Sequence, residues 1–378
     1  MSIVVFLVYG DMRSDFTNLL RLRKFSSSVR VHAIIQGMKV SELGEFGLID
    51  LLSKIAYGAR DNEKESWQKL ILGIGDDAAA WYGNDSIQLA TVDSLVQDVH
   101  FRLDITSWQE LGWRAMAANL SDIAAMGGLP GYALVSLGLP GHTDVDNVTE
   151  LYQGMIRLTR QFGVAIVGGN ITSAPVVFID ITILGKTKSK NQNILTRSAA
   201  RVGDSIAVTG YLGAAAAGLE VLTKNLQFDP EVTSSLKKAF LQPFPRIAEG
   251  QILVEQGIKA AQDISDGLVA DLGHICQSSQ VGARIEVDRI PVYPAVRANF
   301  GERALLLALS GGDDYELIFT GSARTIDNVK KITSCPVTII GEITTEKVGN
   351  VTLVDNTGNP VNLLKAGWEH FIGGTKHE

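Results

Sequence analysis

The sequence predicts two mixed α/β domains, and three observations support this fold class. A chain of 378 residues is long enough for two domains of ordinary size. Hydrophobic residues make up 46% of it and charged residues 20%, which predicts a packed core. Strand-like and helix-like segments are mixed in both halves, and the polar, non-periodic stretch 186–193 separates them. We therefore expect an N-terminal domain over 38–186 and a C-terminal domain over 187–378.

Residues 1–37 are expected to be an extension outside this fold. The apolar run from Ile3 to Tyr9 follows no basic residue and stops before Asp11, which is too short for the core of a signal peptide. Scattered arginines and a run of serines follow, and Met38 comes directly before a helix signal, so we expect the functional start at Met38. An organelle transit peptide is the alternative interpretation of this stretch.

The first element of the N-terminal domain is predicted to be a helix capped by Ser41. Apolar side chains recur there with the i, i+3, i+4, i+7 spacing of one helix face, namely at Leu48, Leu51, Leu52 and Ile55. Residues 86–93 then have the pattern of a strand that runs into Asp93.

A capping box marks the start of a long helix. Ser107 and Glu110 have the spacing in which each side chain bonds the other residue's backbone, and Gly127-Gly128 ends the helix. A short buried strand is expected at 164–167. A second strand is expected at 176–184, where branched apolar residues alternate with polar or smaller ones.

The second half also mixes strands and helices. Expected strands lie at 204–209, 260–264, 283–287 and 315–320. Expected helices lie at 214–222, 246–258 and 268–278. The two halves show no strict sequence repeat, although they could share one architecture.

Charge and cysteine content exclude several classes of protein. The net charge of −7 argues against nucleic acid as the main partner, because a phosphate backbone binds a basic face. Cys276 and Cys335 are far apart and form no CxxC pair, which excludes a disulfide framework and a zinc site and fits a reducing cytoplasm. No run of about 18 apolar residues occurs, so we expect no membrane span.

Acidic side chains stand inside glycine-rich or apolar stretches, where a globular protein tolerates them least. These stretches are Gly73–Asp77, the strand end at Asp93, Asn119–Asp122, Asp263–Gly267 and Ser310–Glu316. A carboxylate in such surroundings is costly to desolvate unless a cation or a donor meets it. Carboxylates without a matching Cys or His cluster favour Mg²⁺ or Ca²⁺. Mg²⁺ commonly binds the phosphates of a substrate, so the first functional prediction is phosphoryl transfer.

Each motif taken alone also has a purely structural explanation. Gly75-Asp76-Asp77 could be a common turn, and Asp263 and Asp266 could be ordinary acids at a helix N-terminus. Asp122 is the stronger candidate, because its helix is small and apolar nearly all round and Asn119 shares its face. A neighbouring arginine or backbone donor could equally satisfy it.

A glycine pair and one histidine complete the candidates. Gly168-Gly169-Asn170 follows a strand, where bare backbone can approach a phosphate or simply turn. His100 is the one histidine beside an acidic motif, and both it and Trp368 could instead be packed side chains. Common nucleotide signatures fail, since Asp180 stands where a P-loop needs its first glycine and 210–213 lacks the dinucleotide spacing.

Together and in this order, the motifs resemble those of thiamine-monophosphate kinases. The wider superfamily includes aminoimidazole ribonucleotide synthetase and selenophosphate synthetase. The matching motifs are GIGDDAA, TVDSLVQDVHF, ANLSDIAAMGGLP, VGGNITS, DISDGLVADL and SGGDDYELIF. The similarity runs from Glu42 to Phe371, essentially the whole chain after Met38. The VHF element, the GWEHF ending and the lack of a reactive N-terminal cysteine favour the thiamine enzyme.

The resemblance implies the aminoimidazole ribonucleotide synthetase type of fold, in a cytoplasmic homodimer whose N-terminal domains meet. The implied reaction passes the γ-phosphoryl group of ATP to thiamine monophosphate with the help of several Mg²⁺ ions, giving thiamine diphosphate and ADP. The implied metal ligands are Asp77, Thr91, Val92 through its carbonyl, Asp93, Asp122, Asp263 and Asp266. The implied ATP contacts are Tyr152, Gly169, Asn170, Arg197 and Ser265. The implied thiamine-phosphate contacts are His100, Asp313 and Trp368.

Asp122 and Arg197 are expected to carry catalysis by charge and position. The acceptor is already an anionic phosphate oxygen, so no general base is expected. Two positions depart from the family pattern. Family members often have Asp where this chain has Asn170, which would leave an amide oxygen for one metal, and they have Glu where this chain has Asp313. Two alternatives stay open, a sister ATP-dependent enzyme that activates an amide or formyl oxygen and a non-catalytic protein that binds ATP and Mg²⁺.

Overall fold

The computed structural model describes residues 44–58, 63–363 and 367. The predicted extension 1–37, the predicted cap at Ser41 and the predicted contact Trp368 lie outside these residues. Helix α4 (Glu45–Gly58) occupies the place of the first predicted helix. Among the helices of the described ranges, none has both the length and the apolar character needed to cross a membrane.

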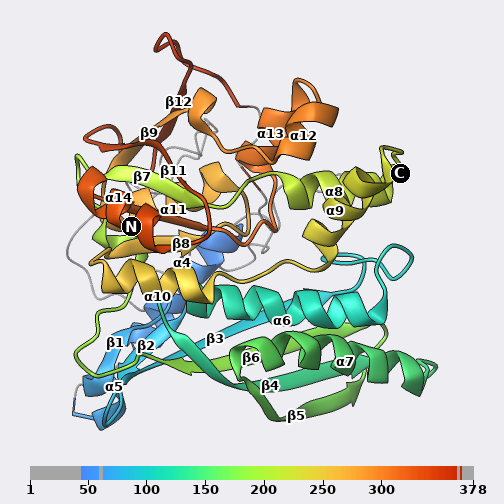
Figure 1. The fold of residues 1–378 in the computed structure, drawn as a ribbon. Helices are drawn as coiled ribbons and strands as arrows, with labels where there is room; N and C mark the ends of the chain where they lie inside the picture. Colours follow the sequence, from blue (N-terminus) through green and yellow to red (C-terminus); the bar gives the residue numbers. More distant parts are fainter. Residues whose placement is uncertain (1–43, 59–62, 364–366, 368–378) are drawn as a thin grey trace, which may run out of the picture. The chain divides into compact units, whose positions relative to one another are not determined.

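The described strands of the first half form one sheet in the order β1-β2-β3-β6-β4-β5 (Figure 1). Neighbouring strands are antiparallel except for β4 and β5, which are parallel. The strands are β1 (Leu70–Leu72), β2 (Ala79–Tyr82), β3 (Ile87–Val96), β4 (Leu129–Leu139), β5 (Ala165–Ser173) and β6 (Phe178–Lys186). The strands predicted at 86–93 and 176–184 are confirmed as β3 and β6.

Burial along the strands shows which face of this sheet is inside. On β6 the fully buried residues are Ile179, Ile181 and Ile183, which confirms the predicted alternation. The expectation of a short buried strand at 164–167 is wrong, because β5 runs on to Ser173 and is exposed along most of its length. The physical reason is its place at the edge of the sheet, where only one neighbouring strand covers it.

The longest helix of the first half, α6 (Trp108–Ala125), begins at the predicted capping box. The Oγ of Ser107 accepts a hydrogen bond from the backbone N of Glu110 at 3.3 Å. In return, Oε2 of Glu110 accepts one from the backbone N of Ser107 at 3.0 Å. The helix ends before Gly127, whose φ of +66° suits glycine, so both predicted ends are confirmed.

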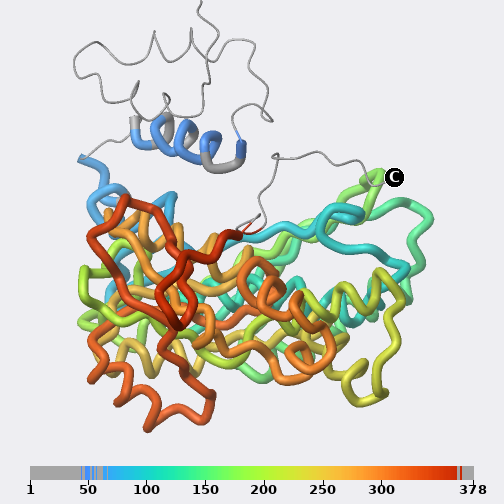
Figure 2. The backbone as a smooth tube through the Cα atoms, turned by 90° about the horizontal axis from the view of Figure 1, so that it is seen from above, coloured from blue at the N-terminus to red at the C-terminus, as the bar shows by residue number. Residues whose placement is uncertain are grey.

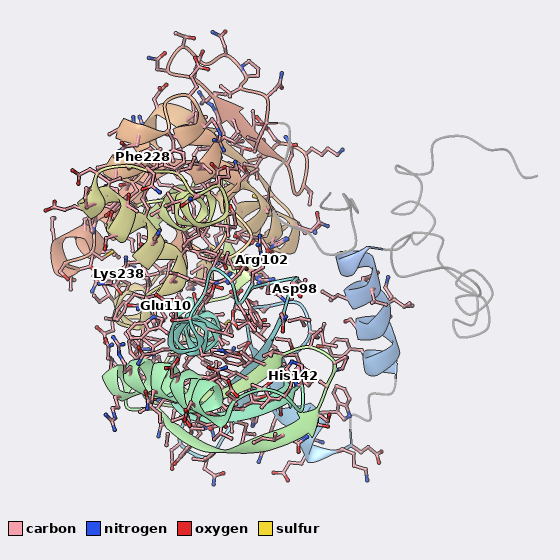
Figure 3. All side chains as sticks on the ribbon, turned by 90° about the vertical axis from the view of Figure 1, so that its right-hand side faces the viewer. Asp98, Arg102, Glu110, His142, Phe228 and Lys238 are labelled. Carbon is pink, nitrogen blue, oxygen red and sulfur yellow. The ribbon has the colours of Figure 1, made fainter. Side chains whose placement is uncertain are left out.

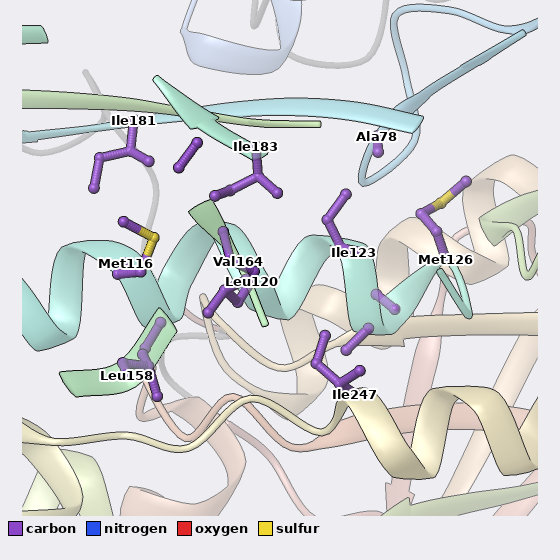
Figure 4. Packing of buried hydrophobic residues seen from close by; sticks show 14 of the residues in the cluster. Ala78, Met116, Leu120, Ile123, Met126, Leu158, Val164, Ile181, Ile183 and Ile247 are labelled. Atoms are coloured by element: carbon purple, nitrogen blue, oxygen red, sulfur yellow. The ribbon is translucent and has the colours of Figure 1, made fainter. Parts of the chain in front are cut away.

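Helix α6 is buried nearly all round because protein covers it on two sides. Figure 4 shows Ile181 and Ile183 of β6 on one side of α6 and Ile247 of α10 (Ile247–Glu255) on the other. Small side chains on α6 allow this double packing, and the buried alanines are Ala115, Ala117, Ala118, Ala124 and Ala125. A helix without a solvent face explains why Asp122 stands in an apolar stretch.

Helix α7 (Val145–Phe162) crosses α6 through a glycine on each helix. A Cβ added to Gly112 would lie 1.9 Å from the carbonyl oxygen of Leu151. A Cβ added to Gly154 would lie 1.9 Å from the carbonyl oxygen of Gln109. The two backbones therefore touch, and the contact runs antiparallel, with the start of α6 against the middle of α7.

The described strands of the second half form another sheet, in the order β12-β9-β11-β7-β10-β8. Only the β12–β9 pair is parallel among them. The strands are β7 (Ser205–Thr209), β8 (Ala260–Asp263), β9 (Gly282–Glu286), β10 (Leu317–Gly321), β11 (Val337–Thr344) and β12 (Val351–Val354). All four strands predicted for this half are confirmed, with ends shifted by at most two residues.

The helices predicted at 214–222, 246–258 and 268–278 are confirmed as α8, α10 and α11. The remaining described helices are α5 (Glu65–Lys69), α8 (Ala214–Thr223), α9 (Pro230–Leu241), α11 (Leu268–Ser279), α12 (Pro294–Asn299), α13 (Arg303–Ser310), α14 (Ala323–Ile332), η1 (Arg197–Ala199) and η2 (Val287–Arg289). Between β6 and η1 the chain has neither helix nor strand. Figure 2 traces the backbone of the protein, coloured from blue at the N-terminus to red at the C-terminus. The domain boundary at 186/187 stays a prediction.

The central strands of the second sheet are buried on both faces. Ala207 and Phe319 join the core around α6, whereas Val208 and Ile318 join a second core with α11 and α13. Because β7 and β8 both run antiparallel to β10, the carboxyl ends of β7 and β8 lie beside the start of β10, at one end of these strands. The acidic motif that begins at Asp263 and the motif that ends at Glu316 therefore meet at this end.

Replacing Gly112 by alanine tests the helix crossing. Gly112→Ala should lower the free energy of unfolding by about 1–3 kcal/mol, because the new methyl group forces two backbones apart. Denaturant unfolding measures this change. Gly141→Ala is the control, since a Cβ there meets no atom within 4 Å. Equal stability of the two variants would contradict the close crossing.

Candidate active site

Three carboxylates from separate motifs converge on one point. Oxygen atoms of Asp77, Asp122 and Asp263 all lie within 4.8 Å of one another. Asp77 stands just before β2, Asp122 is on the last turns of α6, and Asp263 ends β8. Asp77 and Asp263 are buried and Asp122 is half-buried. The fold thus brings together three of the residues that the sequence indicates as metal ligands.

Burial and mutual repulsion disfavour the charged forms of these groups. Burial raises the pKa of Asp263 to about 8, and the charge of Asp77 adds to the effect. Burial raises the pKa of Asp122 well above its usual range, with the charges of Asp93 and Asp263 contributing next. Burial also raises the pKa of Asp77, although Arg197 opposes it. The cluster is therefore short of positive charge.

Arg197 reaches the cluster from η1. Its Nη2 is paired with Oδ1 of Asp77, and its backbone N donates to Oδ2 of Asp76 at 3.2 Å. Burial by itself would lower the pKa of Arg197, but Asp77 raises it, so the guanidinium stays charged. Within the described part of the chain, Oδ2 of Asp77 and Nε of Arg197 are buried and have no hydrogen-bond partner. Both are free to meet a ligand.

Hydroxyl groups orient two of the three carboxylates. The Oγ1 of Thr91 donates to Oδ2 of Asp122 at 2.5 Å. The Oγ of Ser121 donates to Oδ2 of Asp263 at 2.6 Å and so ties α6 to the end of β8. Ser121 was not predicted, and its position beside Asp122 in a buried helix was the only signal for it.

Strand β3 places the other predicted ligands beside the cluster. Thr91 is buried, whereas Val92 is on the opposite face of the strand with its side chain 57% exposed, so Val92 has only its carbonyl to offer. The backbone N of Asp93 donates to Oδ1 of Asn119 at 3.0 Å. The charge of Asp93 contributes to the raised pKa of Asp122, as expected for neighbouring carboxylates.

A carboxylate that the sequence did not point out shapes the loop after β8. The Oδ2 of Asp271, on the first turn of α11, accepts hydrogen bonds from the backbone N of Ser265, Asp266 and Gly267 at 3.1, 3.1 and 3.0 Å. Its Oδ1 accepts from Nε2 of Gln262 at 2.9 Å. Asp271 thereby fixes the loop that carries the predicted ligand Asp266 and the predicted ATP contact Ser265.

The predicted thiamine-phosphate contacts His100 and Asp313 lie close together. Both touch Arg114 of α6, whose Nη1 donates to the carbonyl oxygen of His100 at 2.8 Å and whose Nη2 pairs with Oδ2 of Asp313 at 2.7 Å. The hydroxyl of Tyr315 donates to Oδ1 of Asp313 at 3.1 Å. The Nδ1 of His100 accepts from the backbone N of Val96 at 3.0 Å. Arg114 was not predicted.

The other acids of the 310–316 motif have structural partners. Oδ2 of Asp314 accepts from the backbone N of Gly213 at 2.6 Å, which caps the start of α8. Glu316 forms two hydrogen bonds with Arg246, at 2.6 and 2.5 Å. Of the three acids in this motif, Asp313 is the one that faces α6.

Three predicted ATP contacts stand apart from the cluster within one chain. Tyr152 is on α7, which meets α6 near Gly112, roughly 15 Å along the helix from Asp122. Gly169 and Asn170 are on β5, which β6 and β4 separate from β3. A Cβ on Gly169 would lie 1.8 Å from a carbonyl oxygen of β4, so sheet packing alone requires this glycine. Their binding roles stay predictions.

Comparison with known proteins agrees with this arrangement. Family models described as the N-terminal and C-terminal domains of AIR synthase related protein match residues 75–187 and 201–354. A thiamine-monophosphate kinase from Buchnera aphidicola subsp. Schizaphis graminum is 35% identical over 336 residues, which are 87% of this chain and 100% of that protein. The corresponding enzyme of Escherichia coli strain K12 is 37% identical over 338 residues, 87% of this chain and 98% of that protein.

A solved structure has the same fold. It is described as AaThiL complexed with AMPPCP and TMP, is 34% identical, and matches with a TM-score of 0.75 over 88% of this chain and 99% of that chain. The family models and the relatives both span most of the residues that carry the carboxylate cluster. The chain therefore belongs to the AIR synthase related family and, within it, to the thiamine-monophosphate kinases.

Proposed function

We propose that this protein transfers the γ-phosphoryl group of ATP to thiamine monophosphate, giving thiamine diphosphate and ADP. The observation that carries the proposal is the convergence of Asp77, Asp122 and Asp263, from three motifs, beside Arg197. Relatives that are more than 30% identical over most of the chain are named for this activity. The solved relative is described with AMPPCP, a non-hydrolysable ATP analogue, and TMP.

The carboxylate cluster fits a hard divalent cation, and we infer that it holds Mg²⁺. Its donors are carboxylate oxygens, which Mg²⁺ prefers. Oδ2 of Asp77 is buried, and no described residue forms a hydrogen bond with it. Asp77, Asp122 and Asp263 would hold the ion. Thr91, which donates to Asp122, Asp93, whose charge acts on Asp122, and Asp266 are proposed to complete the set. Bound Mg²⁺ supplies positive charge to the phosphate oxygens as negative charge develops on them.

The residues of the chain itself contribute position and charge. Arg197 keeps its proton beside Asp77 and provides a fixed cation for a phosphate group. The attacking oxygen of thiamine monophosphate is already anionic, so no side chain has to remove a proton from it. The loop held by Asp271 presents Ser265 and Asp266 in one conformation. Catalysis is therefore expected to depend on aligning the γ-phosphate of ATP with the phosphate of thiamine monophosphate, while Mg²⁺ and Arg197 offset the repulsion between them.

We also infer a homodimer in the cytoplasm, with the first sheets of the two subunits in contact. Apolar side chains are exposed on neighbouring strands of the first sheet: Val92, Tyr132, Leu134 and Leu184 are 57%, 56%, 39% and 38% exposed. A second copy would cover such a patch. Buried, unpaired Cys276 and Cys335 accord with a reducing compartment. Light scattering that gives the mass of a single chain would contradict the dimer.

The proposed reaction is tested by following both products. Purified protein with ATP, Mg²⁺ and thiamine monophosphate should form thiamine diphosphate and ADP in equal amounts, because one phosphoryl group moves per turnover. Chromatography of the thiamine compounds and a coupled ADP assay measure this. ADP release that needs an amide or formyl acceptor instead would assign the protein to a sister enzyme. ATP binding without turnover would make it a binding protein.

Asp122→Asn separates a ligand role from a structural one. We expect a fall in turnover of at least about 100-fold at saturating Mg²⁺, because the amide binds the ion more weakly. In EDTA the variant should melt at a higher temperature than the wild type, because one of three repelling buried acids is gone. Asp85→Asn, at an exposed acid, should change neither quantity. Near-normal turnover of Asp122→Asn would remove it from the ligand set.

The raised pKa of Asp263 predicts how stability depends on pH. Its pKa is about 8 in the folded protein against an ordinary 3.8, so between these values the folded state holds more protons than the unfolded state. The contribution of Asp263 to the free energy of unfolding is therefore fully present below about pH 4 and is lost as the pH rises towards about 8. Melting curves in EDTA should show this decline, and Mg²⁺ should reverse it at the upper end. A melting temperature independent of both would contradict the account.

A further inference from the structure

Arg114 is a buried cation for which the reaction described above gives no role. It is on α6, eight residues before Asp122, and is only 5% exposed. Burying a guanidinium is costly unless charged or polar partners replace its water. Helix α6 is otherwise nearly free of charge at its buried positions, so packing alone would favour an apolar residue here.

The head group of Arg114 joins two segments that are far apart in the sequence. Its two terminal nitrogens go to different partners, the carbonyl oxygen of His100 at 2.8 Å and the carboxylate of Asp313 at 2.7 Å. The ring of Phe240 covers one face of the guanidinium, with its centroid 4.3 Å away. Because the guanidinium is planar and rigid, it fixes the spacing of the two segments that it contacts.

Asp313 needs such support because its backbone is in an unfavourable conformation. Its φ is +66°, in the left-handed region that is unfavourable for a residue with a Cβ. Its backbone N donates to the carbonyl oxygen of Ser265 at 2.8 Å, and Tyr315 bonds Oδ1. Arg114 supplies the one charged partner found for this carboxylate in the described part of the chain.

The turn that contains His100 is held in a similar way. The backbone N of Val96 donates a hydrogen bond to Nδ1 of the His100 ring, and Arg114 donates one to the carbonyl oxygen of His100. Figure 3 labels Asp98 and Arg102, which lie on either side of His100 in the sequence. One arginine therefore restrains both segments at this end of the helix.

We propose that Arg114 is a positioning residue for the thiamine end of the phosphate acceptor. The inference rests on the proposed function and on the expectation from the sequence that His100 and Asp313 contact thiamine monophosphate. Eight helical residues span about 12 Å, so α6 carries a metal-binding carboxylate near one end and the anchor of the substrate contacts two turns away. The helix sets the distance between the reacting phosphate and the rest of the acceptor, while Arg114 itself touches neither.

The test uses Arg114→Met and Arg114→Lys in steady-state kinetics. Methionine keeps an apolar stem against Phe240 but loses both hydrogen bonds. The KM for thiamine monophosphate should rise about tenfold or more, because the half-buried carboxylate of Asp313 loses its charged partner. The KM for ATP should stay within about twofold, because the cluster around Asp122 is untouched. The KM of Arg114→Lys for thiamine monophosphate should lie between those of the wild type and Arg114→Met. Lysine keeps the positive charge but lacks the two terminal nitrogens with which the guanidinium reaches two partners.

The matched control is Arg157→Met. Arg157 is an exposed arginine of α7 whose guanidinium lies 5.7 Å from the ring of Trp113. The Arg157→Met variant also removes an arginine beside α6, and we expect it to change neither the KM for thiamine monophosphate nor the KM for ATP. An unchanged KM for thiamine monophosphate in folded Arg114→Met, or equal rises in both constants, overturns the proposal. If Arg114→Met does not fold, the same criteria apply to Arg114→Lys.

A double-mutant cycle separates this inference from the proposed function. Arg114→Met and Asp313→Asn should be non-additive both in the KM for thiamine monophosphate and in the free energy of unfolding. A wild type that makes no thiamine diphosphate would refute the proposed function, and the unfolding cycle would still measure the contact. Additive effects on unfolding overturn the positioning role whatever the acceptor is.

Discussion

Repulsion among buried carboxylates is the constraint around which this structure is built. Oxygen atoms of Asp77, Asp122 and Asp263 lie within 4.8 Å of one another, and the burial of Asp77 and Asp263 leaves little water to screen their charges. The nearby cation Arg197 is already paired with Asp77. Such an arrangement is unfavourable in isolation. The divalent cation that we propose for this site would offset the repulsion, so the fold would keep a binding site at the expense of the stability of the metal-free protein.

The elements around the cluster make this arrangement possible. Helix α6 is covered by the first sheet and by α10, and its small residues let both approach. The hydrogen bond from Ser121 to Asp263 ties the helix to the second sheet. Asp271 holds the loop that follows by accepting three backbone N–H groups. Rigid support of this kind keeps like charges together when their repulsion would separate them.

Local patterns predicted only part of the elements of the fold. The capping box at Ser107 and Glu110 fixed the start of α6, and alternation at 176–184 indicated the inner face of β6. Patterns could not reveal sheet order, which is why exposed β5 was expected to be buried. The α-helices and strands without a prediction are α5, β1, β2, β4, α7, α9, α12, α13, α14, β11 and β12.

The site was predictable only as far as motifs mark it. Asp77, Asp122 and Asp263 stand in unusual sequence surroundings, and the fold brings them together. Arg114 and Ser121 act through residues distant in the sequence, and Asp271 acts through loop backbone, so spacing along the chain did not predict their roles. Of the three, only Ser121 had a signal, its place beside Asp122. Within one motif, Asp313 faces α6 while Asp314 and Glu316 hold the second half together, a division that only tertiary contacts reveal.

The central claim is that these carboxylates form a cation site used with ATP. Its most direct test is titration of Mn²⁺, as a spectroscopic substitute for Mg²⁺, into protein saturated with a non-hydrolysable ATP analogue. Electron paramagnetic resonance counts bound and free ions for the wild type and for Asp263→Asn. The account predicts tight binding by the wild type and loss of at least one bound ion, or a clear fall in affinity, in the variant. Identical stoichiometry and affinity in the two proteins would contradict it.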